Sequence, residues 1–499
     1  MKIYELIAPC HFGLEAVLKR EITDLGYEIS KVEDGKVTFL GDAEAICYAN
    51  IFLRTAERIL LKVGTVHAET FDELFEGVRA LPWEEYIPEN GKFWVTKATS
   101  VKSKLFSTSD IQSIVKKAMV KRMEKAYGKS WFEEDGASFP VRVTFMKDEA
   151  VIGLDTTGIS LHKRGYRQNT AKAPISETLA AALIMLTPWR KDRILVDPFC
   201  GSGTFPIEAA MMAANMAPGM NRSFLSEAWL HLIPKKNWYD AVEEAQEQIN
   251  LNIETDIQGY DIDAAVVHSA RENARRAGVE ELIHFQQRPV SELHHPKKYG
   301  FIITNPPFSL FREFLAWIVE AGKKFAVIGN MNAITYKEVF PLIKDNKVWL
   351  GATGNGNDMV FGVPDGAKVD EKDKAKAARL GYVGNYTRLG NSCWFTSIEH
   401  GRRHEPLPLM SMADNLRFSK HKELKGKAAY DRYDNYDAIE VPFTDAIPSD
   451  YEGVMGVPIS FLIKYCPEQF EILGITDRQN TSCLRTKKYT NVDSQNTTT

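Results

Sequence analysis

The fold is decided by residues 194–203, which read Ile194-Leu195-Val196-Asp197-Pro198-Phe199-Cys200-Gly201-Ser202-Gly203. A short apolar run without alternation is typical of a strand buried on both faces of a parallel sheet. Gly201 and Gly203 then turn the chain toward a helix, because glycine lets the backbone approach a ligand that a side chain would exclude. A Walker loop is excluded, since the Gly-Lys-Ser/Thr sequence is missing. The stretch predicts a doubly wound α/β domain with a ligand at the carboxyl ends of its strands.

A second strand is predicted to end at Asp261, within the sequence Gly259-Tyr260-Asp261-Ile262-Asp263. In dinucleotide-binding folds an acidic residue at this position accepts hydrogen bonds from ribose hydroxyls. We therefore assign Asp261 to the ribose of a nucleoside ligand; the alternative is that it caps the helix predicted over 264–277. Asp263 is the better candidate for that N-cap.

A third strand, residues 301–304, leads into Asn305-Pro306-Pro307-Phe308. We interpret this motif as a site that activates the exocyclic amine of a nucleic-acid base. Such an amine is a poor nucleophile, because its lone pair is delocalised into the ring. Two acceptors on its N–H groups, the Asn305 oxygen and the Pro306 carbonyl, would draw the nitrogen toward tetrahedral geometry. Consecutive prolines restrict the backbone and aim both acceptors, and Phe308 offers an aromatic face to an unstacked base. We expect Asn305, Pro306, Pro307 and Phe308 to be the catalytic motif; the alternative is an ordinary Asn-Pro turn.

Four further motifs follow one another along the first part of the chain: Ser103-Lys104-Leu105-Phe106-Ser107-Thr108-Ser109-Asp110-Ile111-Gln112, Leu161-His162-Lys163-Arg164-Gly165-Tyr166-Arg167, Ala173-Pro174-Ile175-Ser176-Glu177-Thr178-Leu179-Ala180-Ala181-Ala182 and Ala217-Pro218-Gly219-Met220-Asn221-Arg222. With these motifs, residues 1 to about 305 resemble the THUMP-containing methyltransferases that modify guanine at N2 in large-subunit (23S) ribosomal RNA. The resemblance implies a class I, Rossmann-like, S-adenosylmethionine-dependent methyltransferase domain, preceded by α+β ferredoxin-like and THUMP domains.

The sequence Asp-Pro-Phe-Cys-Gly-Ser-Gly-Thr from Asp197 onward resembles the S-adenosylmethionine loop of class I amino-methyltransferases. In that family Asp197 would face the methionine end of the cofactor. The residues implied to bind S-adenosylmethionine are Pro174, Thr178, Asp197, Pro198, Phe199, Cys200, Gly201, Ser202, Gly203, Asp261 and Ile262.

Beyond Phe308 the likeness changes. A second resemblance rests on four stretches of sequence: Asn305-Pro306-Pro307-Phe308-Ser309-Leu310-Phe311-Arg312-Glu313-Phe314, Ala326-Val327-Ile328-Gly329-Asn330, Gly390-Asn391-Ser392-Cys393-Trp394-Phe395 and Tyr436-Asp437-Ala438-Ile439-Glu440-Val441-Pro442. From about 302 to 475 the chain resembles the adenine-N6 DNA methylases of type II restriction systems. The catalytic motif is thus the place where two resemblances meet.

The motifs and composition predict six segments. These are a ferredoxin-like unit (1–50), a THUMP RNA-binding domain (51–155), a linker with the first catalytic-domain helix (156–190), the methyltransferase domain (191–400), a C-terminal extension for target recognition (401–478) and a disordered tail (479–499). Within the methyltransferase segment we expect residues 351–388 to be a long surface loop, because they carry glycine, asparagine and a charge run.

Lysines gather on and before a helix that we expect Ser109 to cap, with Gln112 as its capping-box partner. Lys116, Lys117 and Lys121 lie off the apolar stripe of this helix, and Lys97, Lys102 and Lys104 precede it. They are candidate phosphate contacts; the alternative is a solvated helix face. Arg164 and Arg167 flank Gly165-Tyr166 and are candidate contacts to phosphate and base, with an interdomain hinge as the alternative.

Composition limits the class of protein. The chain has 499 residues, 44% of them hydrophobic, and a net charge of −4, so any nucleic-acid surface must be a local basic patch. No apolar run approaches the ~20 residues of a membrane span, and the N-terminus lacks a signal-peptide core. The six cysteines are scattered, which favours free thiols over a disulfide or zinc framework. We therefore expect a cytoplasmic protein with a nucleic-acid partner, no membrane partner and no metal.

Three functions follow. The first is an RNA guanine-N2 methyltransferase, favoured because the RNA-binding module is complete. The second is a site-specific adenine-N6 DNA methyltransferase, suggested by the C-terminal half. The third is a non-catalytic RNA-binding protein.

Overall fold

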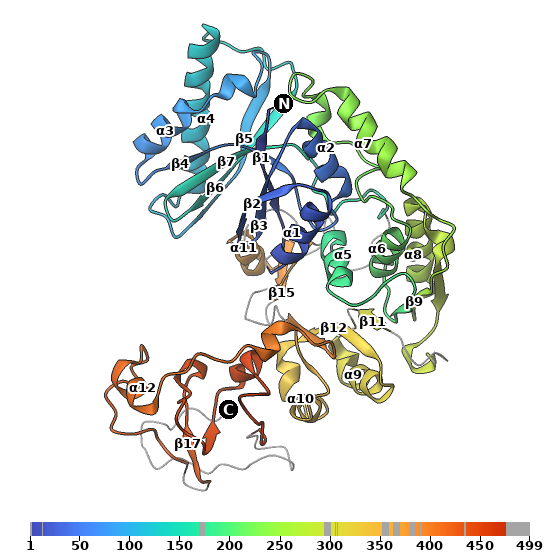
Figure 1. Ribbon diagram of the computed structural model, residues 1–499, viewed down its shortest axis with the longest axis vertical. Helices are drawn as coiled ribbons and strands as arrows, with labels where there is room; N and C mark the ends of the chain where they lie inside the picture. Colours follow the sequence, from blue (N-terminus) through green and yellow to red (C-terminus); the bar gives the residue numbers. More distant parts are fainter. Residues whose placement is uncertain are drawn as a thin grey trace. The chain divides into compact units, whose positions relative to one another are not determined.

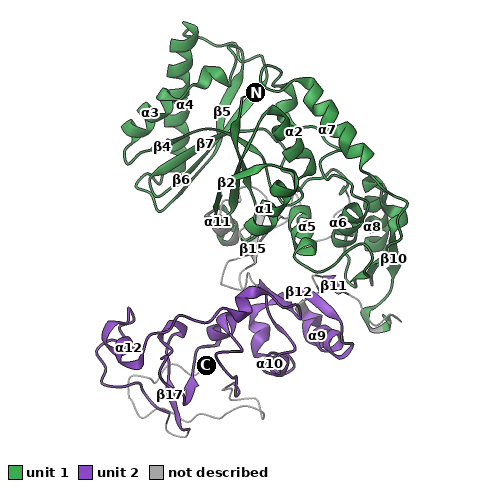
Figure 2. Ribbon diagram, in the orientation of Figure 1, with its two compact units in different colours: residues 1–295, 360–388 green, residues 296–359, 389–499 purple. Residues whose placement is uncertain are grey.

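The chain forms two compact units in the computed structural model (Figure 2). One contains residues 1–295 and 360–388, and the other contains residues 296–359 and 389–499. The residues described are 2–11, 13–168, 175–293, 301–304, 306, 308–351, 359–362, 370–379, 386–389, 392–433 and 436–475. The boundary at 295/296 falls inside the segment 191–400 that the motifs predict as the methyltransferase domain. The tail predicted over 479–499 lies outside the described residues.

The N-terminal part of the first unit is built on one seven-stranded sheet with the order β2-β3-β1-β4-β7-β6-β5. Its strands are β1 (Tyr4–Pro9), β2 (Glu28–Glu33), β3 (Lys36–Gly41), β4 (Leu60–His67), β5 (Lys92–Val101), β6 (Ser138–Met146) and β7 (Glu149–Asp155). β1 pairs with both β3 and β4. The two N-terminal modules therefore share one sheet and one hydrophobic core.

Helices α1 (Glu15–Asp24), α2 (Ala43–Phe52), α3 (Phe71–Ala80) and α4 (Thr108–Tyr127) accompany this sheet (Figure 1). α3 packs against β4 and α4 packs against β5. The helix that Ser109 was predicted to cap begins at Thr108, with Ser107 at the N-cap position and no side-chain capping bond. Thr108 already has helical geometry, so the Ser109 cap prediction is wrong.

The remainder of the first unit carries a parallel three-stranded array, β8 (Leu195–Asp197), β9 (Ile257–Asp261) and β10 (Ile283–Gln287). β9 pairs in parallel with both neighbours. Helices α5 (Glu177–Met185), α6 (Thr204–Ala213), α7 (Lys235–Glu247) and α8 (Ala264–Ala277) surround it. α7 also packs against α2, where the Tyr48 hydroxyl donates to Glu244. The cofactor loop thus belongs to the same compact unit as the THUMP sheet.

The second unit continues with strands β11 (Phe301–Thr304), β12 (Lys324–Asn330), β13 (Trp349–Leu350) and β16 (Ser392–Thr396), and with helices α9 (Phe311–Glu320) and α10 (Phe340–Lys344). β11 and β12 are parallel, whereas β16 runs antiparallel to β12 and to β13. A Cβ on Gly329 would lie 2.4 Å from the Phe311 ring and 2.9 Å from the Phe395 ring. Glycine on β12 therefore lets these two rings meet, with centroids 4.9 Å apart.

The segment 351–388, predicted as a long loop, contains β14 (Met359–Gly362), α11 (Glu371–Arg379) and the start of β15 (Tyr386–Leu389). β14 and β15 form a two-stranded sheet. The charge run at 370–374 begins α11, because Lys and Glu are good helix formers on an exposed face.

The C-terminal extension has a hydrophobic core of its own, formed around α12 (Met412–Phe418), β17 (Ala438–Glu440) and β18 (Val454–Gly456). Buried members include Leu424, Tyr430, Ile439, Val441, Ile447 and Phe461. Across the described parts of the chain, no helix is both long and apolar enough to cross a bilayer.

Candidate active site

The glycine loop joins β8 to α6 through two residues of left-handed geometry. Gly201 has φ +53° and Gly203 has φ +84°, a region that other residues rarely adopt. The Gly203 N–H donates to the Cys200 carbonyl at 2.8 Å, which closes the turn, and Gly203 is the N-cap of α6. Asp197, 2% exposed, accepts from the Phe199 N–H at 3.2 Å. The loop is therefore fixed at the carboxyl end of its strand.

The end of β9 holds the loop from the other side. The Cys200 N–H donates to the Tyr260 carbonyl at 2.8 Å, and the Gly201 N–H donates to Asp261 Oδ2 at 3.2 Å. A Cβ on Gly259 would lie 2.5 Å from the Phe285 ring. Gly259 therefore permits the close packing of β9 against Phe285.

Asp261 and Asp263 have separate roles. Asp263 accepts from the Ala265 N–H at 2.8 Å and is the N-cap of α8, so the capping prediction for Asp263 is confirmed. Asp261 Oδ1 accepts from the Asp263 N–H at 3.1 Å. Between them Ile262 is 70% exposed, which is unusual for a large aliphatic side chain at a strand end.

These residues fit a nucleoside cofactor with an amino-acid end. Ser202 is buried, and its hydroxyl makes no hydrogen bond within the described part of the chain. A Cβ on Gly201 would meet no atom within 4 Å, so the space beside the loop is open. The Asp261 carboxylate, with two lone pairs on each oxygen, keeps acceptor capacity beyond its two backbone donors. Exposed Ile262 offers an apolar surface to a base.

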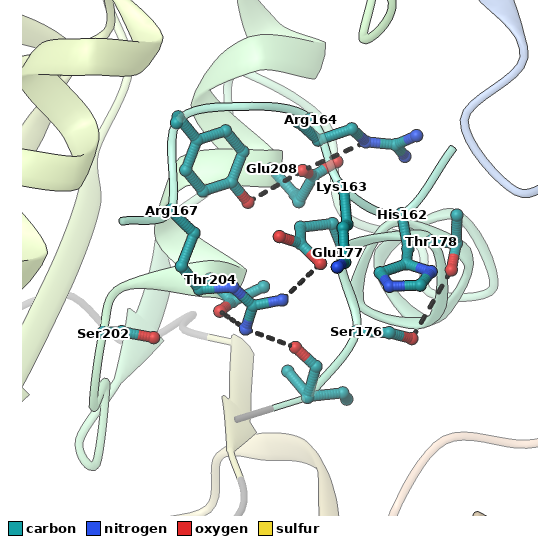
Figure 3. A network of polar contacts seen from close by, with 12 residues as sticks. His162, Lys163, Arg164, Arg167, Ser176, Glu177, Thr178, Ser202, Thr204 and Glu208 are labelled. Atoms are coloured by element: carbon teal, nitrogen blue, oxygen red, sulfur yellow. Dashed lines mark hydrogen bonds and ion pairs between the residues drawn. The ribbon is translucent and has the colours of Figure 1, made fainter. Parts of the chain in front are cut away.

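A buried polar network lies beside the loop and contains both arginines that were candidate nucleic-acid contacts (Figure 3). Arg164 Nε lies 3.6 Å from Glu208 Oε1, with side-chain exposures of 2% and 0%. Arg164 also donates to the carbonyls of Leu161 and Arg54. It is buried by internal partners, so its predicted contact to phosphate is wrong.

Arg167 is occupied in the same way. Its guanidinium pairs with Glu177 and donates to the Ile175 carbonyl at 2.8 Å and to Thr204 at 3.4 Å (Figure 3). Its side chain is 10% exposed. Arg167 ties α5 to the start of α6 and is a positioning residue, not the nucleic-acid contact that the sequence suggested.

Thr178 points away from the loop residues and toward Glu57. Its hydroxyl donates to Glu57 Oε1. Two histidines also contact the Glu57 carboxylate: His11 Nε2 lies 3.2 Å from Oε1, and His162 Nδ1 lies 3.2 Å from Oε2. Burial raises the pKa of the Glu57 carboxyl, but hydrogen bonds from the two histidines outweigh it, and the pKa lies well below its usual range. Pro174, the other cofactor candidate from this motif, lies outside the described residues.

The catalytic motif follows the predicted strand, β11, whose residues Ile302, Ile303 and Thr304 are buried. Pro306 is buried, and Phe308 begins a 3-10 turn, Phe308–Leu310. Asn305, Pro307 and the side chain of Phe308 lie outside the described part of the chain.

The candidate lysines divide into paired and unpaired residues. Lys104 pairs with Glu69, Lys116 with Glu134 at 3.1 Å and Lys121 with Glu124 at 2.6 Å. Lys102 and Lys117 are exposed. Three of the six candidate lysines are therefore neutralised by neighbouring carboxylates.

Lys97 differs, because its charged neighbours are Arg142 and Arg58. Sequence reasoning missed these two arginines. Arg142 could have been found from its place between Val141 and Val143, since strand alternation puts it on the opposite face.

Family models match four parts of the chain. An RlmL ferredoxin-like domain matches residues 5–60, a THUMP domain matches 68–155, and an RMKL-like methyltransferase domain matches 164–310. The model described as adenine-specific methyltransferase EcoRI matches residues 238–499, more than half of the chain. Both of the last two matches include residues 305–308, where the two resemblances were predicted to meet.

Similar proteins agree with this assignment. The chain is 51% identical over 310 residues to the "Putative RNA methyltransferase YpsC" of Bacillus subtilis (strain 168), covering 62% of this chain and 80% of YpsC. The structure of a "possible methylase from Clostridium difficile 630" is 39% identical, with a TM-score of 0.66, covering 82% of this chain and 100% of that one. The structure of "SMU.472, a putative methyltransferase complexed with SAH" is 36% identical, with a TM-score of 0.63, and the match covers 74% of this chain and 96% of that one.

The predicted fold class, the predicted cofactor and the prediction of an enzyme are confirmed by these matches. SAH, S-adenosylhomocysteine, is what remains of S-adenosylmethionine after its methyl group has left. The chain belongs to the S-adenosylmethionine-dependent methyltransferases, in the THUMP-containing family of YpsC by its N-terminal domains and in the adenine-specific methyltransferase EcoRI family by residues 238–499.

Proposed function

We propose that this enzyme methylates the exocyclic amine of a base in RNA, and that the base is guanine, modified at N2 in large-subunit ribosomal RNA. The proposal rests on one observation: the same chain matches a THUMP domain over 68–155 and an RMKL-like methyltransferase domain over 164–310. YpsC, which is named as an RNA methyltransferase, shares this region at 51% identity.

The cofactor would be held by the loop and by the end of β9. When bound, S-adenosylmethionine supplies an electrophilic methyl group on its sulfonium sulfur. Asp197, the Ser202 hydroxyl and the N-terminus of α6 would hold the amino-acid end, with Pro198, Phe199, Cys200, Gly201 and Gly203 shaping the loop. Asp261 would accept from the ribose hydroxyls, and Ile262 would cover one face of the adenine.

The catalytic motif would activate the amine. The Asn305 side-chain oxygen and the Pro306 carbonyl each accept one N–H of the amine, which draws the nitrogen toward tetrahedral geometry and localises its lone pair. Phe308 stacks on the base, and Pro307 holds the backbone that aims both acceptors. The nitrogen loses its extra proton to solvent after it has bonded to carbon, so a strong general base is not required.

The test is methyl transfer from labelled S-adenosylmethionine to large-subunit ribosomal RNA transcribed in vitro, and to duplex DNA, followed by digestion to nucleosides. We expect N2-methylguanosine from the RNA. Asn305→Ala should lower the rate about a hundredfold, as for loss of one preorganised hydrogen-bond partner in an active site. Its affinity for S-adenosylhomocysteine should not change, because Asn305 is proposed to contact the base alone.

A second candidate is adenine-N6 methylation of DNA, favoured by the EcoRI match over 238–499, which includes the catalytic motif. The two acceptors suit either amine, so the modified nucleoside decides between the candidates. Label found in DNA as N6-methyldeoxyadenosine, with none in the RNA, rejects the guanine proposal.

A further inference from the structure

α3 and α4 pack on one face of the sheet formed by β4, β7, β6 and β5, which is lined by buried residues such as Phe93, Val141 and Ile152. The opposite face of these four strands is called the open face. Strand alternation directs the intervening residues to the open face. Thr99, Thr144 and Val151, at the centre of that face, are only partly buried.

A row of cations crosses this open face. Lys97 of β5 is in register with Arg142 of β6, Arg142 with Gly153 of β7, and Gly153 with Lys62 of β4. Lys62 pairs with Glu5 at 2.5 Å. The Leu60 side chain packs beside Gly153, where an added Cβ would lie 3.2 Å from Leu60 Cβ.

Positive charge is in excess near Lys97. Arg58 Nη1 and Arg142 Nε share a single carboxylate oxygen, Asp155 Oδ2, at 2.7 and 3.1 Å. Lys97 itself makes no hydrogen bond or ion pair with any described residue. The charged neighbours that act on Lys97 are therefore two arginines, in a protein whose total charge is −4.

The ionisation of Lys97 reports this excess. Burial lowers the pKa of the Lys97 ammonium, and repulsion from Arg142 and then Arg58 lowers it further, to about 8. Without a bound anion, the charged form of Lys97 is therefore destabilised by repulsion from the neighbouring arginines.

An aromatic ring accompanies the cations on the same face. Trp94 precedes Lys97 on β5, is in register with Pro140 and is 36% exposed. Lys92 Nζ lies 6.0 Å from its ring centroid. One strand thus carries an indole ring and an ammonium group on the same face. This combination holds single-stranded nucleic acid, in which bases stack on aromatic rings and cations follow the backbone.

We propose that the open face of this sheet binds a single-stranded segment of RNA, with Trp94 stacking on a base and with Lys97 and Arg142 contacting the phosphate backbone. The proposal rests on the proposed function in taking RNA as the ligand. It moves the RNA surface of the THUMP part from α4, where Lys116 and Lys121 pair with glutamates, to the opposite face of the sheet.

The test is fluorescence anisotropy of the full-length enzyme with a rhodamine-labelled oligocytidylate, without S-adenosylmethionine, over a range of salt concentrations. Lys97→Gln should weaken binding several-fold and reduce the slope of log K against log salt by about 1, as for one lost phosphate contact. Lys97→Arg should retain affinity. Trp94→Ala should weaken binding about tenfold, as for one lost stacking partner.

Each variant has a matched control. Lys19→Gln removes the same charge from an exposed position on α1, and Trp131→Ala removes an indole that is 79% exposed in the loop after α4. Both controls should bind RNA as the wild type does. Lys97→Gln should also keep or raise the melting temperature, because it relieves like-charge repulsion, so misfolding cannot explain its loss of affinity.

Equal loss of affinity in Lys97→Gln and Lys19→Gln would place the RNA elsewhere and overturn the proposal. Displacement of the oligocytidylate by oligoglutamate as efficiently as by unlabelled RNA would assign the face to an acidic peptide, and would also overturn the proposal.

Methyl transfer is measured separately, so that failure of this surface and failure of the proposed function can be distinguished. If Lys97→Gln binds RNA normally while the wild type methylates RNA, this surface is rejected and the proposed function stands. If the wild type methylates no RNA but Lys97→Gln loses affinity, the proposed function fails and this surface stands.

Discussion

The backbone N–H of Gly201 donates to the Asp261 carboxylate at 3.2 Å, so one side chain links the glycine loop to the end of β9. The other oxygen of the same carboxylate accepts from the Asp263 N–H at 3.1 Å. Both donors are backbone groups of short loops, which orients the carboxylate before any ligand arrives. A ribose hydroxyl would then meet a charged acceptor that need not reorganise.

Asp261→Asn should weaken S-adenosylhomocysteine binding by about tenfold or more. The amide removes the negative charge and one acceptor, and a hydrogen bond to a charged group contributes about 1.5–3 kcal/mol. Isothermal titration calorimetry measures the affinity. Asp263→Asn is the control, because asparagine caps a helix as well as aspartate does. Equal affinities for the two variants would remove Asp261 from the ribose site.

Gly201→Ala should lose cofactor affinity as well as stability. Its φ of +53° makes alanine unfavourable by about 1 kcal/mol, and the added methyl would occupy the open space beside the loop. Gly128, at the C-cap of α4, has φ +65° and likewise no atom within 4 Å of a Cβ. Gly128→Ala should therefore lower the free energy of unfolding by a similar amount and leave cofactor binding unchanged. If both variants bind S-adenosylhomocysteine normally, Gly201 does not face the cofactor.

Thr178→Val separates a structural role from cofactor binding. The Thr178 hydroxyl donates to buried Glu57, and a buried acceptor that loses a donor costs about 1–3 kcal/mol. We expect a lower melting temperature by calorimetry, with unchanged affinity for S-adenosylhomocysteine. Thr178→Ser, which keeps the hydroxyl, should recover most of the stability. A tenfold loss of affinity at unchanged stability would return Thr178 to the cofactor site.

Local patterns were sufficient for the elements around the loop. The apolar run at 194–196, the two glycines and the cap at Asp263 are each specified within a few residues, and the structure places strand, turn and helix there. The buried strand at 301–304 was predictable for the same reason. In each case the interaction that decides the conformation lies in the same stretch of sequence.

Burial and pairing over long separations could not be predicted in this way. Arg164 and Glu208 are 44 positions apart, and nothing near Arg164 shows that its guanidinium meets a carboxylate inside the fold. Lys104 likewise meets Glu69 across 35 positions. A charge pattern shows which residues are cationic, whereas the tertiary fold decides which of them keep an excess of positive charge.

The last prediction concerns pH. The pKa of Lys97 is lowered to about 8, below the usual ~10.4 of lysine. Between these values the unfolded chain binds more protons than the folded protein, so this residue makes the protein more stable as pH rises through that window. RNA favours the charged form, so affinity for oligocytidylate should fall as pH rises through about 8. The charged groups beside Lys97 are Arg142 and Arg58, and both arginines pair with Asp155. Lys97→Arg should bind RNA with little pH dependence from 7 to ~9, and anisotropy titrations measure both proteins. The same decline in the arginine variant would mean that another group titrates, and Lys97 would then not be the ammonium that contacts the RNA.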